Sequence, residues 1–283
     1  MDGVSAILLT NDRPIEVFGR ALASIVSQTH EVSEIIVVDT GDNVALSYEK
    51  ENLLSRITGN CKHQYISTRP ASNGGYGRNV GVAACTGEFI SFLDDDDEWD
   101  EEKTKFQMAH MRPEVGIVHS DYYVEDEDGR LSLFSESDKP ISNEILCGNY
   151  IGCTSMSLLR KKCFNDAGGF DGNFVSAQEW DLWVNMMDFC ENVYANGCVG
   201  IKHHSADSIT ANRKKRRKGW FQFFSKHIRR YFKNIPCLEF AISTYVFEMF
   251  KKKCFFSAMI GISVKAGAIA FCIFSNKRLV RRS

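Results

Sequence analysis

Four consecutive aspartates at positions 94–97 are the side chains of this sequence that point most directly to chemistry. They follow an apolar segment, residues 88–93, which predicts a strand that ends at the aspartates. Like charges this close raise one another's pKa or destabilise the fold unless a cation neutralises them. Short carboxylate side chains suit Mg²⁺ or Mn²⁺ and leave coordination positions for water and phosphate. The run predicts a metal site for a nucleotide; the alternative is a solvated acidic loop.

The segments around this run alternate between strand and helix patterns. Short apolar runs rich in strand formers alternate with segments whose apolar residues recur at helical spacing. Such alternation predicts an α/β fold with a largely parallel sheet covered by helices. The predicted strands are 4–10, 34–39, 63–67 and 88–93, and the predicted helices are one opened by Pro14, then 43–54, 78–85 and 101–111.

Polar residues stand where three of the predicted strands end. Thr10 closes the first strand, Asp39 closes the second, and the aspartate run follows the fourth. Ligands of open parallel sheets bind beyond the carboxyl ends of the strands. We therefore expect these residues to converge on one crevice that binds a nucleotide.

Five sequence segments together resemble glycosyltransferase family 2, the inverting enzymes of the GT-A fold. The likeness spans roughly residues 4–211 and favours a bacterial polysaccharide or capsule type of enzyme. It implies a Rossmann-like, mostly parallel sheet with flanking helices, a nucleotide-sugar donor, most often a UDP-sugar, and a Mn²⁺ or Mg²⁺ ion. The segments are VSAILLTNDR, SIVSQTHEVSEIIVVD, NGGYGRNVGVAACTGEFISFLDDDDEW, GGFD and QEWDLW.

The resemblance assigns the donor side of the site. In similar proteins the DxD element binds the ribose and the metal, which implies Asp94 and Asp96 here, with Asp97 as a further metal ligand. Arg78 and Asn79 occupy the place of an Arg-Asn pair beside the donor, and a guanidinium suits diphosphate oxygens. Alternatively, Arg78 pairs with an aspartate of the run and Asn79 caps a helix.

The resemblance also implies a catalytic base at the start of a helix. The family commonly carries Asp after Glu there, whereas this chain has Gln178-Glu179, so Glu179 is the candidate base and Asp181 its rival. The alternative is an acidic first turn that only complements the helix dipole.

Two further positions bear on the ligands. Thr40 stands where the family often has a second aspartate that helps to read uracil. His204 is a candidate metal or phosphate ligand, and the alternative for it is a structural histidine.

Charge divides the chain into two parts. The net charge is −2, but residues 1–211 hold 16 basic against 34 acidic side chains, and residues 212–283 hold 18 against 2. We therefore expect a catalytic domain over 1–211 and a basic, aromatic helical region over 212–283. The region is either membrane-associating or a lid packed on the catalytic domain.

The basic region has the composition of an interfacial helix. The basic run at 213–218 precedes aromatic and apolar residues at helical spacing, a pattern that favours binding to an anionic membrane surface. Segment 255–274 has the length of a membrane span, but Lys265 at its centre favours a buried or surface-lying helix. The aromatic and apolar residues are Trp220, Phe223, Phe224, His227, Ile228 and Tyr231.

The cysteines and the N-terminal segment bear on the compartment. The ten cysteines contain no C-x-x-C pair, and the sequence opens on a strand pattern rather than a signal-like segment. Both features predict reduced thiols in a cytoplasmic protein. Together with the basic region, they predict a protein held peripherally on the inner face of the cell membrane.

Two other function classes compete with the glycosyltransferase. A nucleotidyltransferase would carry a Gly-rich basic loop after the first strand, where this chain has TNDRPIE. A nucleic-acid binder could use the basic tail, but the acidic character of residues 1–211 disfavours nucleic acid as a partner. The expected partners are a nucleotide-sugar donor, a glycan or lipid-linked acceptor with a free hydroxyl, and an anionic membrane surface, whereas the sequence leaves the sugar and the oligomeric state open.

Overall fold

A computed structural model describes residues 3–68, 73–135, 144–203 and 213–251, except for the side chains of residues 144 and 213 and of 244–251. The chain divides into two compact units. The first comprises Met1–Ser142 and Asn149–Phe224, and the second comprises Asn143–Gly148 and Ser225–Ser283. The first unit thus extends beyond residue 211, where the predicted domains meet.

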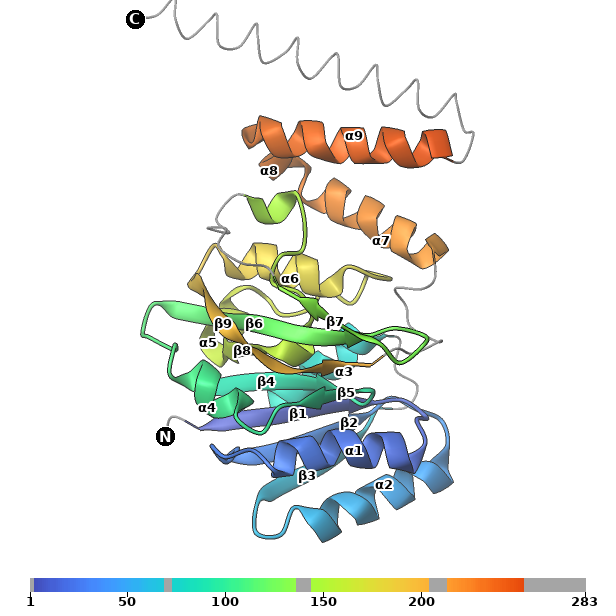
Figure 1. The fold of residues 1–283 in the computed structure, drawn as a ribbon, viewed down its shortest axis with the longest axis vertical. Coiled ribbons are helices and arrows are strands. Elements are labelled where there is room, and N and C mark those ends of the chain that lie inside the picture. Colours follow the sequence, from blue (N-terminus) through green and yellow to red (C-terminus); the bar gives the residue numbers. More distant parts are fainter. Residues whose placement is uncertain (1–2, 69–72, 136–143, 204–212, 252–283) are drawn as a thin grey trace, which may run out of the picture. The chain divides into compact units, whose positions relative to one another are not determined.

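The first half of the sheet is parallel, as predicted (Figure 1). Its strands lie in the order β3-β2-β1-β4, and all three pairings are parallel. The register pairs Thr10 with Asp39 and Leu9 with Asp94, so the carboxyl ends of these strands are level. The strands are β1 (Val4–Thr10), β2 (Glu34–Asp39), β3 (Lys62–Ser67) and β4 (Phe89–Asp94).

Three helices connect these strands. They are α1 (Ile15–Val26), α2 (Val44–Ile57) and α3 (Gly74–Ala84). Right-handed crossovers put α1 and α2 on one face of the sheet and α3 on the other (Figure 1). The apolar side chains Phe18, Ala21, Leu22 and Ile25 of α1 recur at helical spacing and are buried, whereas Val26 is 41% exposed. Helix α3 begins four residues before the predicted 78–85, because the Asn73 side chain accepts a hydrogen bond from the Tyr76 amide and caps it there.

The second half of the sheet is mixed. From β4 the strand order continues as β8-β6-β9-β5, with β7 paired to β6. The pairings β4–β8 and β5–β9 are antiparallel, whereas β6–β9 is parallel. The strands are β5 (Asp97–Trp99), β6 (Val115–Glu125), β7 (Leu131–Phe134), β8 (Ser157–Arg160) and β9 (Glu191–Lys202). The aspartate run is therefore not one loop, because Asp94 ends β4 and Asp97 begins β5.

The first unit has four further helices among the described residues, of which the first three have nine residues or fewer. They are α4 (Lys103–Met108), α5 (Lys161–Asp166), α6 (Gln178–Met186) and most of α7 (Arg213–Lys226). Helix α4 is shorter than the predicted 101–111, since residues 101–102 and 109–110 form turns at its two ends.

The second unit contains a disulfide that the sequence analysis did not predict. Cys147 follows the short 3-10 helix η1 (Glu144–Leu146), and Cys237 lies in α9 (Ile235–Lys251). Their Cα atoms are 5.1 Å apart, within the range of a disulfide. The prediction that all cysteines are reduced is wrong for this pair, because only the fold brings residues 90 positions apart together.

The predicted aromatic face of the basic region is largely turned inward. A new helix, α8 (Ile228–Lys233), interrupts the expected continuous spacing. Phe223 and Tyr231 are fully buried and His227 is 3% exposed. The Tyr231 hydroxyl donates to the Leu146 carbonyl at 2.6 Å. These three residues are thus part of the protein interior, which corrects their assignment to a membrane-facing stripe.

No helix within the described ranges is long and apolar enough to cross a membrane. Segment 255–274, predicted as a buried or surface-lying helix, lies outside the described residues.

A buried lysine lies under the mixed half of the sheet. Lys103 is 1% exposed, and its ammonium donates to the Ser91 hydroxyl at 2.7 Å and to the Gln107 side-chain oxygen at 2.9 Å. The same ammonium lies 4.3 Å from the centroid of the Trp99 ring. Burial lowers the pKa of Lys103 to about 7.

The Lys103 pKa predicts a pH dependence of stability. The unfolded lysine keeps its proton up to about pH 10.4, so the unfolded state binds more protons than the folded state above about pH 7. The free energy of unfolding of the wild type should therefore rise, relative to Lys103→Met, by about 2 kcal/mol between about pH 7 and pH 9. Urea unfolding of both proteins at the two pH values measures this difference; parallel pH profiles would show that Lys103 is not desolvated.

Candidate active site

Residues at and just after the end of β1 bind Asp95, the second aspartate of the run. The Thr10 hydroxyl donates to Asp95 Oδ2 at 2.7 Å and accepts from the buried Lys50 ammonium, also at 2.7 Å. Arg13 reaches Asp95 Oδ1 at 3.3 Å and Asp96 Oδ2 at 2.9 Å. Burial, with the neighbouring Asp96 charge, raises the pKa of Asp95 to about 7 against the hydrogen bond from Thr10. Thr10 thus lies at the predicted crevice, with its hydroxyl engaged inside the protein.

Helix α3 supplies the partner of the first aspartate. The buried Arg78 guanidinium forms an ion pair with Asp94 and lies 5.5 Å from the centroid of the Phe170 ring. The Asn79 amide is engaged with backbone, since it donates to the Phe170 carbonyl at 2.8 Å and accepts from the Phe170 amide at 3.0 Å. The sequence analysis gave an ion pair of Arg78 with an aspartate of the run as the alternative to donor binding, and this ion pair is present. Asn79 holds the turn at residues 168–170 and does not cap α3, whose cap is Asn73.

The last aspartate of the run is fully buried and faces β9. Asp97 is opposite Lys202 in the β5–β9 pairing, and the Lys202 ammonium lies 3.8 Å from Asp97 Oδ2. Among the described residues neither Asp97 oxygen has a hydrogen-bond partner. Burial raises the pKa of Asp97 to about 6 although Lys202 opposes this, and the Asp97 charge raises the pKa of Lys202 well above its ordinary value.

Every aspartate of the run therefore has a protein cation beside it. Arg78 pairs with Asp94, Arg13 with Asp95 and Asp96, and Lys202 with Asp97. The sequence analysis assigned no role to Arg13 or Lys202. The signal was present, because Arg13 lies three residues after the end of β1 and Lys202 is the last residue of β9.

Asp39 lies at the predicted strand end, and its carboxylate oxygens accept three hydrogen bonds from within the protein. Its carboxylate accepts from the Gly41 amide at 2.9 Å, the Ser47 hydroxyl at 2.6 Å and the Tyr65 hydroxyl at 2.5 Å. It is 1% exposed. Thr40 accepts from the Asn11 side chain at 3.1 Å. Asp39 therefore shapes the turn that follows β2, and its contact with a base stays a prediction.

The two candidate bases differ in their surroundings. Glu179, in the first turn of α6, is half-buried, whereas Asp181 is fully buried and accepts from the Asn185 amide at 3.3 Å. Ala177, just before α6, has a φ of 62°, a left-handed conformation that is uncommon outside glycine.

Electrostatics connects Glu179 to the aspartate run. Burial lowers the pKa of Arg78, and the charges of Asp94 and then Glu179 outweigh it; Glu179 also contributes to the raised pKa of Lys202. The start of α6 lies against the first turn of α3, since a Cβ atom at Gly75 would be 3.1 Å from the Gln178 side-chain oxygen. His204 lies outside the described residues. His203, its neighbour, contacts Glu125 at 2.7 Å and Glu98 at 3.4 Å.

The family model described as glycosyl transferase family 2 matches residues 5–168, more than half of the chain. The chain belongs to this family. Its similarity to curated polysaccharide enzymes agrees with that result. It is 26% identical over 223 residues to the putative colanic acid biosynthesis glycosyl transferase WcaA of Escherichia coli K12, covering 74% of this chain and 75% of WcaA.

A second Escherichia coli relative has a more specific name. WfgD, named a UDP-Glc:alpha-D-GlcNAc-diphosphoundecaprenol beta-1,3-glucosyltransferase, is 25% identical over 223 residues, covering 77% of this chain and 83% of WfgD. These relatives identify this chain as a glycosyltransferase of the bacterial polysaccharide type.

Solved structures confirm the GT-A architecture. The mannosyltransferase PcManGT of Pyrobaculum calidifontis, in complex with GDP-Man and Mn²⁺, has a TM-score of 0.67 at 14% identity, covering 98% of this chain and 80% of that one. Residues 1–349 of S. aureus TarS, in complex with UDP-GlcNAc, give a TM-score of 0.60 at 14% identity, covering 86% and 80%. At this identity the likeness extends to the fold alone.

The aspartate run of this glycosyltransferase fits a hard divalent cation in its chemistry. Its donors are carboxylate oxygens, and the two oxygens of Asp97 are buried without hydrogen bonds from the described residues. No three metal-binding side chains converge within the described part of the chain. Asp96 and Asp97 are thus suitable ligands that need oxygen atoms from elsewhere, as from a diphosphate, to complete a coordination shell.

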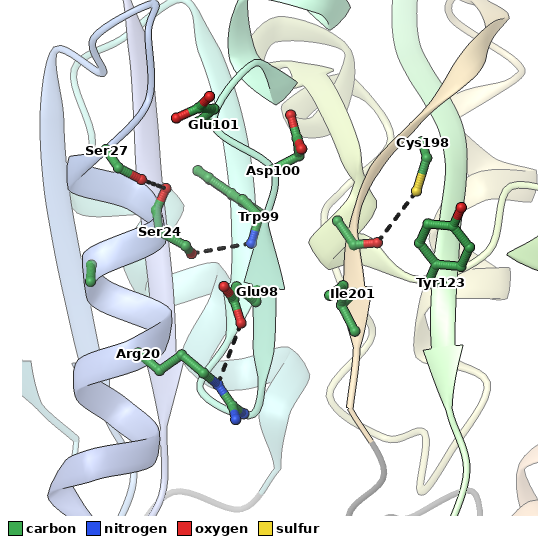
Figure 2. Close-up of a pocket in the computed structure, with 12 residues that line it drawn as sticks. Arg20, Ser24, Ser27, Glu98, Trp99, Asp100, Glu101, Tyr123, Cys198 and Ile201 are labelled. Atoms are coloured by element: carbon green, nitrogen blue, oxygen red, sulfur yellow. Dashed lines mark hydrogen bonds and ion pairs between the residues drawn. The ribbon is translucent and has the colours of Figure 1, made fainter. Parts of the chain in front are cut away.

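A pocket of about 610 Å³ lies on the other side of β5 (Figure 2). Figure 2 shows Arg20 of α1 beside Glu98 on one side of the pocket, with Tyr123 and Cys198 on the other side. The Arg20 and Glu98 side chains form an ion pair at 3.7 Å. Neighbouring residues of a strand point to opposite faces, so Glu98 lines this pocket while Asp97 faces Lys202. None of the predicted site residues lines it, so this pocket is separate from the strand exits of the glycosyltransferase.

The Asp97–Lys202 pair predicts a measurable coupling in the glycosyltransferase. Lys202→Met leaves a buried carboxylate without its cation and should lower the free energy of unfolding by about 2 kcal/mol. The expected loss is below that of a fully buried pair because the Lys202 side chain is 34% exposed. Asp97→Asn added to Lys202→Met should restore part of the loss. Urea unfolding of the two single variants and the double variant measures the coupling; simple additivity would contradict it.

Proposed function

We propose that this enzyme transfers a sugar, with inversion, from a UDP-sugar to a hydroxyl of a glycan or lipid-linked acceptor in a metal-dependent reaction. Two comparisons support a UDP donor: WfgD is named for UDP-Glc, and the TarS structure contains UDP-GlcNAc. WfgD is also named for an acceptor attached to diphosphoundecaprenol, which supports a lipid-linked acceptor here.

The proximity of Glu179 to the cations that hold the aspartate run is the observation on which the proposal depends. An inverting displacement requires the donor-binding groups and the base to lie on opposite sides of the anomeric carbon. The negative charges of Glu179 and of the aspartate run both raise the pKa of Arg78 and of Lys202. A carboxylate near these cations therefore supports Glu179 as the base on the side of the sugar opposite the diphosphate.

Glu179 is our candidate for the base. It takes the proton of the acceptor hydroxyl as that oxygen bonds to the anomeric carbon, while the bond from that carbon to the diphosphate oxygen breaks and the nucleoside diphosphate leaves. Glu179 suits this role better than Asp181, because Glu179 is half-buried whereas Asp181 is fully buried and bonded to Asn185. The left-handed Ala177 fixes the direction in which α6 presents this carboxylate.

The donor side has proposed roles for the aspartates and Arg78. Asp94 and Asp96 would hold the ribose and the metal, with Asp97 as a further ligand. A Mn²⁺ or Mg²⁺ ion supplies positive charge to the departing diphosphate when bound. Arg78 is buried beside Asp94 and can exchange that partner for a diphosphate oxygen, which its planar guanidinium suits.

The exposed basic run of α7 supports peripheral binding on the inner face of the cell membrane. The side chains of Lys214 to Lys218 are exposed, and Phe221 on the same helix is 41% exposed. Basic side chains beside an exposed aromatic ring are typical of helices that bind anionic lipid surfaces. An acceptor carried on a lipid would place the reaction there.

Three substitutions test the catalytic assignment. Asp96→Ala and Asp97→Ala should abolish metal-dependent donor binding, because each removes a hard oxygen ligand. Glu179→Gln should leave donor binding within about twofold and lower transfer about a thousandfold, as expected for loss of a general base. A thermal-shift screen of UDP-, GDP- and TDP-sugars with Mn²⁺ identifies the donor, and transfer is then measured with it.

Asp128→Asn, on the exposed turn between β6 and β7, is the matched control and should change neither property. Normal transfer by the Glu179 variant would assign the base to another residue. Donor binding that persists in both aspartate variants would refute the metal site.

The membrane proposal makes a separate prediction. Each basic residue near an anionic leaflet contributes about 1 kcal/mol, so Arg216→Gln with Arg217→Gln should weaken binding to phosphatidylglycerol vesicles roughly thirtyfold. Lys105→Gln with Arg130→Gln removes the same charge from other exposed sites and should have little effect. Vesicle co-sedimentation at low and high salt measures both. An equal loss in the two double variants would mean that net charge, and not α7, controls binding.

A further inference from the structure

Helix α7 is bonded directly to the segment that carries the candidate base. The Gln222 side chain accepts a hydrogen bond from the Val175 amide at 3.1 Å and donates one to the Asn173 carbonyl at 2.7 Å. The Ser176 hydroxyl donates to the Lys215 carbonyl at 3.1 Å. Three polar contacts thus join α7 to residues 173–176, which stand immediately before Ala177 and α6.

Packing reinforces these hydrogen bonds. The fully buried Phe223 ring stacks on Trp180, with centroids 3.9 Å apart and planes at 19°. Gly219 lies against Ser176 so closely that a Cβ atom there would be 2.1 Å from the Ser176 hydroxyl oxygen. Trp180 is the residue after Glu179, so α7 contacts the chain on both sides of the candidate base.

The same segment is also connected to the donor side. The Asn73 side chain, which caps α3, donates to the Gly172 carbonyl at 2.6 Å. The side-chain amide of Gln178 donates a hydrogen bond to the Phe174 carbonyl at 2.8 Å and closes the turn before α6. Residues 172–178 therefore lie between α3, which carries Arg78, and α7.

The charged surface of α7 is its N-terminal turn. Lys214 to Lys218 are exposed there, whereas Gly219, Phe223 and the half-buried Gln222, later in the helix, contact the 173–180 segment. Gln222 and Phe223 therefore connect the helix that carries the basic run to the segment that carries Glu179.

We propose that α7 is a positioning element for the base: the Gln222 amide and the Phe223 ring hold residues 173–180, and an anionic lipid surface bound to the basic run tightens that hold and raises turnover. The proposal rests on the proposed roles of Glu179 and of the basic run. Gln222 is a positioning residue, since it acts through Val175 and Asn173 and touches no reacting atom.

The first test separates positioning from binding. Gln222→Met keeps the side-chain length but removes both hydrogen bonds, and it should lower kcat about tenfold because misplacing a catalytic group slows the chemical step. The donor KM should stay within about twofold, since the two Gln222 hydrogen bonds go to Val175 and Asn173, and neither is a proposed donor ligand. Ser225→Ala, an exposed neighbour on α7, is the matched control and should change neither constant.

Wild-type kcat in Gln222→Met, with Glu179→Gln inactive, would overturn the positioning role while leaving the proposed function intact. Transfer by Glu179→Gln would overturn both. A rise in donor KM equal to the fall in kcat/KM would assign Gln222 to donor binding instead and would also refute the proposal.

The second test needs no substrate and no altered core. Hydrogen exchange of the amides at 173–177 is followed in the wild type with and without vesicles of phosphatidylglycerol and phosphatidylcholine in equal parts. The vesicles should slow exchange at Val175 about fivefold, the factor expected from strengthening one hydrogen bond. Arg216→Gln with Arg217→Gln should lose this protection. Unchanged exchange in wild-type protein that is fully bound to vesicles would refute the coupling.

Discussion

The structure of this glycosyltransferase depends on the balance between the aspartate run and three basic side chains. Asp95 and Asp97 are buried carboxylates, and such groups are tolerated only when cations or hydrogen bonds compensate their lost hydration. Arg13 comes from the exit of β1, Arg78 from α3 and Lys202 from the end of β9. The ion pairs therefore fix these three elements around the end of β4, in addition to neutralising charge.

This balance has a consequence for how ligands enter. Each aspartate of the run already has a protein cation beside it, so the charge of the run is largely compensated before a ligand binds. A divalent metal alone would add positive charge next to two guanidinium groups and an ammonium, which electrostatics disfavours. A diphosphate alone would add negative charge beside carboxylates. Metal and diphosphate together avoid both penalties, so the arrangement favours their joint binding over either one by itself.

Sequence patterns predict the parallel half of the sheet well, because its strands are short apolar runs separated by amphipathic helices. The register follows too, since Thr10, Asp39 and Asp94 all end their strands. The mixed half is poorly predicted, because β5 consists of three residues inside an acidic run and pairs with β9, about a hundred positions away. The Cys147–Cys237 disulfide is hidden for the same reason: it depends on tertiary proximity.

The candidate site shows the same division. Residue types identify the aspartates, Arg78 and Glu179, whose chemistry is evident from the motif. They do not reveal which side chains already form hydrogen bonds within the protein. The Asn79 side chain bonds to the Phe170 backbone, and the Asp39 carboxylate accepts from Ser47 and Tyr65. Nor do they reveal Lys202, whose importance comes from facing a buried carboxylate across a strand pair.

The orientation of α7 follows from competition between its two surfaces. Its sequence offers a basic run and several aromatic rings, and from spacing alone either could face the protein. Burial of Phe223 against Trp180 and the bidentate contact of Gln222 remove apolar and amide surface from water. Lysine ammonium groups would lose hydration if turned inward without partners. The helix therefore leaves its basic run in water, while Gln222 and Phe223 contact the segment that carries the carboxylate proposed to accept the proton.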